Sequence, residues 1–183
     1  WCFTAKASTV TGTVPITCYT LSTGRTPTYH YSNGRYVYTG YIDATDQCYI
    51  QQLLSDGYVR VKYPVGRGRY RTEYARTNAF FVNEYFSPTQ VKAGRNLTTY
   101  RKGNLSQRFG SIYSSDSVIV IGTSGNSTQM LYPVSGGYKL GFVSGVFSQS
   151  SVNNGDGDST VYPEDGYYKI RSAINQNYVL DVY

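Results

Sequence analysis

Acidic residues, histidine and long apolar runs are all scarce in this chain of 183 residues. It holds 11 Asp and Glu against 17 Lys and Arg, a net charge of +6, and one histidine, His30. No run of 18 apolar residues occurs, so we expect no membrane insertion. One histidine and three scattered cysteines argue against a zinc site, and we expect no metal and no cofactor. We expect no catalytic activity, because the sequence contains no H-E-x-x-H motif, no G-x-S-x-G motif and no close pair of carboxylates.

The basic residues concentrate before residue 150. Residues 14–83 hold 8 basic and 4 acidic residues (+4), and residues 84–149 hold 6 and 2 (+4). Residues 150–183 hold 2 and 5 (−3), and Lys6 adds the last +1. This distribution suits either an anionic partner or a solvated surface. No nucleic-acid-binding motif accompanies it, so we expect no nucleic-acid partner.

Tyrosine is abundant and supplies 21 of the 29 aromatic residues, which favours β-structure. In the run from 58 to 63, Val59, Val61 and Tyr63 alternate with charged residues, as in a half-buried strand. Asn33-Gly34 and Asp56-Gly57 are hairpin turn signals. No segment of ten or more residues has helical periodicity, so the sequence predicts an all-β fold.

The stretch from Gly24 to Phe81 is repeated as Gly94 to Phe147. The matched residues share type and order: Gly24 with Gly94, Thr28 with Thr98, Gly40 with Gly110, Asp46 with Asp116, Tyr63 with Tyr132, and Tyr74 with Phe142. The two copies predict two small tandem domains, residues 14–83 and 84–149. We expect them to superpose as separate barrels, with no continuous sheet across both.

Three further segments flank the copies. Residues 1–13 form an N-terminal extension, and residues 150–162, rich in Gly, Ser, Asn and Asp, are predicted to be a linker. Residues 163–183 have the pattern of a β-hairpin. Because the chain opens on Trp1 without a signal peptide, we expect a mature or excised fragment.

The two copies resemble bacterial SH3-like domains, small barrels carried in tandem by secreted wall-associated proteins. The resemblance rests on the Gly-Arg opening, the hairpin of residues 51–63, the Tyr-Pro after it and the closing Phe80-Phe81. It covers about residues 14–149. It implies a non-catalytic module, extracellular or attached to the cell wall, that binds peptidoglycan or polysaccharide. Such a module would be a monomeric part of a larger multidomain chain.

The closing segment resembles the first strands of a ricin-type β-trefoil lectin. Gly166, Tyr168 and Ile170 match the G-x-Y-x-I opening of its repeat, and residues 177–182 match the strand that follows. Asp181 matches the sugar-binding aspartate of that repeat. The usual partners of this aspartate would lie beyond residue 183, so a solvated strand-end residue is the alternative interpretation.

The resemblance to SH3-like domains implies an aromatic groove with basic residues beside it. The candidate ligand-binding residues of the first copy are Tyr29, Tyr31, Tyr36, Tyr38, Tyr70, Tyr74 and Arg69. Packing or solvent-exposed tyrosines are the alternative. In the second copy Tyr36 and Tyr38 are replaced by Ser106 and Arg108, so we expect binding to depend on the first copy more than on the second.

Cys18 and Cys48 both fall on predicted strands of the first copy, and position 118 of the second copy is Val. We predict a disulfide between them, with two buried free thiols as the alternative and Cys2 left over. Two other functions stay open. One is a structural spacer, and the other is a cysteine-dependent wall hydrolase that uses Cys18 or Cys48 with His30.

Overall fold

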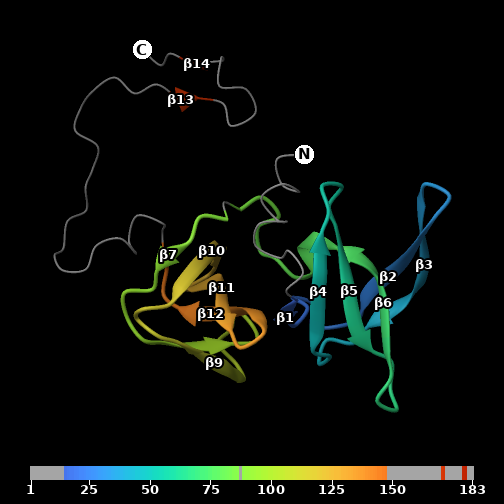
Figure 1. Cartoon of the computed structure of the whole chain (residues 1–183), viewed down its shortest axis with the longest axis horizontal. Helices are drawn as coiled ribbons and strands as arrows, with labels where there is room; N and C mark the ends of the chain where they lie inside the picture. The colour runs from blue at the N-terminus through green and yellow to red at the C-terminus, as the bar shows by residue number, and fades with distance from the viewer. Residues whose placement is uncertain (1–14, 87, 148–169, 172–178, 181–183) are drawn as a thin grey trace.

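The computed structural model describes residues 15–86, 88–147, 170–171 and 179–180, and this part of the chain is all-β (Figure 1). Twelve strands belong to one hydrogen-bonded sheet, and the only helix among the described residues is the short 3-10 turn η1 (Thr77–Ala79). The strands of the first half are β1 (Ile16–Cys18), β2 (Thr26–Ser32), β3 (Arg35–Ile42), β4 (Cys48–Leu53), β5 (Tyr58–Pro64) and β6 (Tyr70–Arg76). Those of the second half are β7 (Val91–Lys92), β8 (Leu97–Tyr100), β9 (Arg108–Ile112), β10 (Ser117–Ser124), β11 (Ser127–Val134) and β12 (Gly137–Ser144).

The two halves repeat the same strand order. The first half is hydrogen-bonded in the order β3-β2-β6-β5-β4-β1, and the second in the order β9-β8-β12-β11-β10-β7. One bulge puts an extra residue into β3 opposite Thr28 and into β9 opposite Thr99. A second bulge puts an extra residue after Ile50 in β4 and after Val120 in β10. Bulges fix where a strand bends. The duplication read from the sequence therefore extends to topology and to strand curvature.

A buried threonine–tyrosine pair occupies the same place in each half. Thr28 Oγ1 lies 3.2 Å from Tyr63 Oη, and Thr99 Oγ1 lies 2.8 Å from Tyr132 Oη. Each threonine faces a glycine across its hairpin, and a Cβ added at Gly110 would lie 3.1 Å from Tyr132 Oη. In the structure, the residue equivalent to Thr28 is thus Thr99 and not Thr98. The register of the second hairpin is shifted by one residue relative to the sequence alignment.

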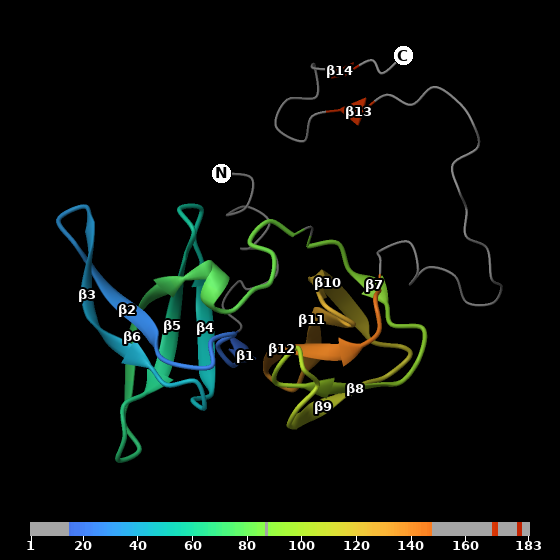
Figure 2. The ribbon, with the colours of Figure 1, turned by 180° about the vertical axis from the view of Figure 1, so that it is seen from behind.

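The expectation of two separate barrels without a continuous sheet is wrong. Strand β1 pairs antiparallel with β4 of its own half and parallel with β12 of the other half. Ile16, for example, lies opposite both Ile50 and Tyr138. The sheet therefore runs from one half into the other without closing (Figure 2). A strand of three residues with two available edges can complete both sheets at once.

The larger hydrophobic core is shared between the halves. Ile119, Ile121, Leu131 and Leu140 of the second half pack in one buried cluster with residues of the first half. The first-half members are mainly β-strand residues and the two closing phenylalanines: Ile16, Ile42, Ile50, Leu53, Val59, Val61, Tyr63, Phe80 and Phe81. A smaller cluster belongs to the second half alone: Val91, Ala93, Ile112, Val118, Met130, Tyr132, Val143 and Phe147.

Polar contacts also join the halves. The buried side chain of Gln129 donates to Phe80 O at 2.7 Å and accepts from Val82 N at 2.9 Å. Lys102 Nζ donates to Thr20 O, and to Ser22 O at 3.0 Å. Because side chains of one half satisfy the backbone of the other, the two halves are held in one relative orientation.

Strands β13 (Ile170–Arg171) and β14 (Val179–Leu180) pair antiparallel, as expected of a hairpin. The predicted extension 1–13, the linker 150–162, the rest of segment 163–183 and Asp181 lie outside the described residues. No described helix is long and apolar enough to cross a membrane. The part of the chain that the structure describes also has no group of three or more His, Cys, Asp or Glu placed to hold a metal ion.

Candidate functional site: a tyrosine cluster in the first half

Six tyrosines come together on the first half, and we call them the tyrosine cluster. Their positions follow from strand register, since residues opposite each other in a sheet share a face. Tyr29 lies opposite Tyr38 and Tyr74, and Tyr31 lies opposite Tyr36. The cluster consists of Tyr29, Tyr31, Tyr36, Tyr38, Tyr58 and Tyr74.

The rings form a connected set built around Tyr36. Its ring stacks on Tyr58 with centroids 3.6 Å apart and an interplanar angle of 14°, and meets Tyr74 edge-on at 5.5 Å. Tyr31 lies 4.9 Å from Tyr36, and Tyr29 lies 5.8 Å from Tyr58. Aromatic pairs at such separations contribute about 0.5–1.5 kcal/mol beyond buried area. The cluster is therefore a preorganised surface, and its rings support one another.

Charged groups fix the centre of the cluster. Tyr36 Oη donates to Asp56 Oδ2 at 2.6 Å, and the Arg76 guanidinium lies 4.2 Å from the centre of the Tyr58 ring. Partial burial and the Asp56 carboxylate both raise the pKa of Tyr36, so this hydroxyl stays protonated and keeps donating. The Asp56 carboxylate thus already accepts a hydrogen bond from within the cluster.

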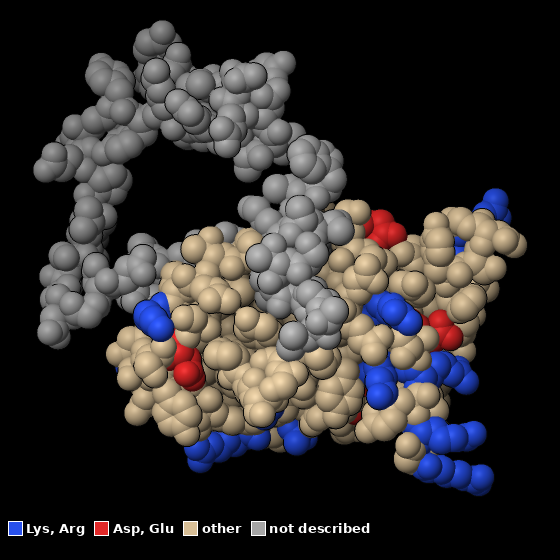
Figure 3. All heavy atoms as spheres, viewed as in Figure 1, with Lys and Arg blue, Asp and Glu red and all other residues tan. Residues whose placement is uncertain are grey.

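The cluster has a buried floor and an exposed rim. Tyr58 is 7% exposed, whereas Tyr31 and Tyr38 are 49% and 62% exposed. Large half-exposed aromatic rings on a rigid base are suited to stack on a flat apolar face of a ligand, such as that of a sugar ring. The described residues 15–86 and 88–147 carry 14 basic and 6 acidic residues, or +8 (14 − 6). Figure 3 shows several Lys and Arg side chains projecting at the lower right, where the β5–β6 hairpin of Figure 1 lies.

Five of the seven residues predicted from the first copy are brought together, and two are not. Tyr70 lies at the other end of β6, where it contacts the Tyr49 ring at 6.3 Å and the Lys62 ammonium at 4.8 Å. Arg69 lies in the turn before Tyr70, held by backbone hydrogen bonds with Val65 and Gly66. Both residues therefore lie apart from the tyrosine cluster, because β6 is extended and separates Tyr70 from Tyr74 along the strand, and their role in binding stays a prediction.

Sequence reasoning missed Tyr58, Asp56 and Arg76. A signal was present for Tyr58, because strand alternation puts it on the face of Arg60 and opposite to Val59. Placing Arg76 beside it required the β5–β6 register, in which Tyr58 lies opposite Arg76. That register depends on the loop of residues 65–69, whose conformation includes positive φ at Gly66, Arg67 and Gly68.

The second half has no equivalent cluster. Register equivalence puts Arg108 in the place of Tyr38, Ser127 in the place of Tyr58 and Ser144 in the place of Arg76. The β8–β9 hairpin instead carries Lys102, which bonds to the first half. The same hairpin thus presents aromatic rings in one half and joins the halves in the other.

The predicted disulfide is not formed in the structure, although its two cysteines are neighbours. Cys18 and Cys48 lie directly opposite each other on β1 and β4, buried and with both thiols free. The Cys48 thiol points to the Asp46 carbonyl oxygen at 3.6 Å. In the second half the equivalent facing pair is Val91 and Val118 on β7 and β10. The free-thiol alternative describes this structure, and the disulfide stays a prediction for oxidising conditions.

Both thiols are poor nucleophiles in this setting. Burial raises the pKa of Cys18 well above its usual value, and burial together with Asp46 raises the pKa of Cys48 to about 12. His30 is engaged elsewhere, with its Nδ1 3.4 Å from Glu73 Oε2. Only the thiolate is an effective nucleophile.

No protein-family model, curated protein or solved structure gives a significant match to this chain.

Proposed function

We propose that this chain is a non-catalytic binding module for cell-wall peptidoglycan or polysaccharide, acting outside the cell or on the wall. The observation that carries the proposal is the tyrosine cluster, six linked rings of which two are about half exposed. Exposed apolar side chains that gather in one patch mark an interaction site more often than single exposed side chains do. The second half has the same strand order and keeps aromatic residues, Tyr100 and Phe142, in the places of Tyr29 and Tyr74. It replaces Tyr38 with Arg108 and Tyr58 with Ser127, which supports a role of the exposed rings beyond folding.

We further propose that each half is a variant of the SH3-like fold. Six short strands in a repeated order, with bulges at matching places, support this assignment. The shared sheet through β1 departs from a pair of independent barrels. The β13–β14 pairing supports the proposal that residues 163–183 begin a β-trefoil-like segment, in which Asp181 would be the sugar-binding aspartate.

Two other functions have weaker support. A cysteine-dependent hydrolase needs an accessible thiolate beside a free histidine, whereas Cys18 and Cys48 are buried with raised pKa values. The shared core and the contacts of Lys102 and Gln129 favour a spacer as the second candidate, since they make residues 15–147 a stiff unit.

The test compares retention of the full chain on insoluble bacterial walls before and after Tyr36→Ala/Tyr38→Ala. Each stacking ring contributes on the order of 1 kcal/mol, so we expect retention to weaken by about tenfold or more. Tyr113→Ala is the matched control, because Tyr113 is a 63% exposed tyrosine of the second half. Circular dichroism checks the fold, and wall turbidity reports hydrolysis.

Three results would contradict the proposal. Unchanged retention by the folded double variant would move binding away from the cluster. No retention of the wild type would favour the spacer. Clearing of the wall suspension, lost in Cys48→Ala, would favour a hydrolase.

A further inference from the structure

A groove opens beside the tyrosine cluster where β2 and β6 part. The two strands pair at Tyr29 and Tyr74, and beyond them Leu21 N donates to Ala79 O at 2.8 Å. Between these two links lies a cavity of about 460 Å³, with Tyr29 and Arg76 on its walls. Its size is in the range of small-ligand sites.

The groove contains an unsatisfied hydroxyl. Thr26 lines it and is 4% exposed, and its Oγ1 has no hydrogen-bond partner among the described residues. Thr20 and Thr77, each next in sequence to a lining residue, also have buried hydroxyls without a described partner. Buried polar groups are normally satisfied, so the shielded Thr26 hydroxyl behind the cavity wall is a group that a ligand would satisfy once the wall adjusts to it.

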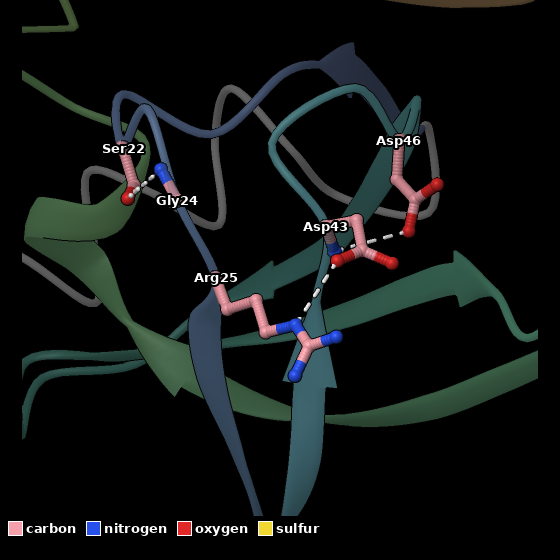
Figure 4. A network of polar contacts seen from close by, with 5 residues as sticks. All are labelled: Ser22, Gly24, Arg25, Asp43 and Asp46. Atoms are coloured by element: carbon pink, nitrogen blue, oxygen red, sulfur yellow. Dashed lines mark hydrogen bonds and ion pairs between the residues drawn. The ribbon is translucent and has the colours of Figure 1, made fainter.

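Two arginines stand on the rim, each over an aromatic ring. The Arg25 guanidinium lies 3.8 Å from the centre of the Tyr41 ring, and its Nε is 3.4 Å from Asp43 Oδ1 (Figure 4). Arg76 is positioned over Tyr58. Asp43 offsets part of the charge of Arg25. The rim thus offers guanidinium N–H groups with their planes oriented in advance, the arrangement that suits a carboxylate.

The loop that carries Arg25 is itself fixed. Gly24 N donates to Ser22 Oγ at 3.0 Å, and Asp43 N donates to Asp46 Oδ2 at 3.2 Å, as Figure 4 shows. These local bonds hold both ends of the Arg25–Asp43 pair. The rim therefore needs little ordering on binding.

The second half provides an internal comparison. Leu97 stands in the place of Thr26, since each lies opposite the matching isoleucine, Ile42 or Ile112. Ser144 stands in the place of Arg76, and the Arg95 guanidinium lies 4.7 Å from the centre of the largely buried Phe147 ring. The polar groups of the groove are thus replaced in the sister fold, which folds without them.

We propose that this groove binds a carboxylate-bearing sugar unit of an acidic polysaccharide. The guanidinium groups receive the carboxylate, Thr26 Oγ1 exchanges a hydrogen bond with a ring hydroxyl, and the Tyr29 ring covers an apolar face. A peptide strand fits less well, because Pro27 in this part of β2 has no N–H to offer. The inference rests on the proposed function, since it names the charged unit of the polymer whose other units stack on the tyrosine cluster.

The test uses the full chain, isotope-labelled for NMR, with D-glucuronate as the probe and D-glucose and acetate as controls. We expect D-glucuronate to shift the amide signals of residues 21–29 and 76–79, with a dissociation constant in the millimolar range. D-glucose lacks the carboxylate and acetate lacks the ring, so each should bind about tenfold more weakly or worse.

Two variants and a matched control sharpen the result. Arg76→Gln and Thr26→Val should each weaken D-glucuronate binding by about fivefold to tenfold. Thr26→Val should leave the melting temperature unchanged or raise it, since it removes an unsatisfied hydroxyl and keeps the shape. Arg95→Gln changes the arginine that matches Arg25 in the sequence repeat but lies in the second half, so it should alter neither D-glucuronate binding nor the effect of these variants.

Several outcomes would overturn the inference. They are no shifts in residues 21–29 and 76–79, equal binding of D-glucose or acetate, or unchanged affinity in both folded variants. None of them bears on wall retention through Tyr36 and Tyr38, so failure here and failure of the proposed function are distinguishable. If the wild type bound D-glucuronate but was not retained on walls, the proposed function would fail and the assignment of the groove would stand.

Discussion

At the scale of single residues, the most informative feature is a hydroxyl pair that both halves retain while their surfaces diverge. Thr99 and Tyr132 are fully or almost fully buried, and their hydroxyls satisfy each other. Removing one member leaves the other buried and unpaired, which costs more than the bond itself contributes.

We therefore expect Tyr132→Phe to lower the free energy of unfolding by about 1–3 kcal/mol. Urea denaturation of the variant and the wild type measures the difference. Lys139→Ala is a control from the neighbouring strand β12, because it removes a half-buried side chain and leaves this pair intact. A change below about 0.5 kcal/mol in Tyr132→Phe would mean that another group satisfies Thr99.

The same tyrosine predicts how stability depends on alkaline pH. Burial raises the pKa of Tyr132 to about 12, against about 10 for an exposed tyrosine. Between these values the unfolded chain releases the proton and the folded chain keeps it, so stability falls as pH rises. We expect Tyr132 to contribute at most about 1.4 kcal/mol per pH unit between pH 10 and 12. The slope in this window should be shallower in Tyr132→Phe, and an equal slope would contradict the assignment.

At the scale of elements, the two halves place different side chains at one equivalent buried position between paired strands. Cys18 and Cys48 face each other across β1 and β4, and Val91 and Val118 face each other across β7 and β10. Since the Val pair is accommodated in the same strand context, the thiols are not needed for packing. Small apolar side chains of similar volume exchange at low cost.

We expect Cys18→Val/Cys48→Val to change the free energy of unfolding by less than about 1.5 kcal/mol under reducing conditions. Under oxidising conditions the wild type should become more stable than this variant, because a disulfide would restrict the unfolded chain. Denaturant curves with and without reductant test both statements. Thiol counting on the unreduced, denatured chain gives three if the pair stays reduced and one if it is joined.

Sequence patterns predicted the elements better than their assembly. Alternation and the turns at Asn33-Gly34 and Asp56-Gly57 identified hairpins, and the repeat identified matching strands. The pairing of β1 with both halves could not be predicted, because the sequence of a three-residue strand does not indicate which strands will pair with its two edges. The tyrosine cluster was predicted in outline, but Tyr58 and Arg76 needed a register set by backbone geometry in residues 65–69.

At the scale of the whole molecule, the shared core determines how the chain should unfold. Ile119, Ile121, Leu131 and Leu140 would be exposed if the halves separated, and so would the polar bonds of Gln129. We expect a single cooperative transition for residues 15–147 in calorimetry, with equal calorimetric and van't Hoff enthalpies. Two resolved transitions would show that the halves unfold independently.

The position of β1 between β4 and β12 has a consequence under mechanical load. β1 begins the described part of the chain and β12 is its last strand before residue 147, and the two run parallel. Tension applied at residues 15 and 147 draws these neighbours past each other along their length, so their hydrogen bonds are loaded in shear and must break together. Hairpin strands pulled from their open ends would instead peel apart one bond at a time. Residues 15–147 would therefore resist traction applied between their two ends.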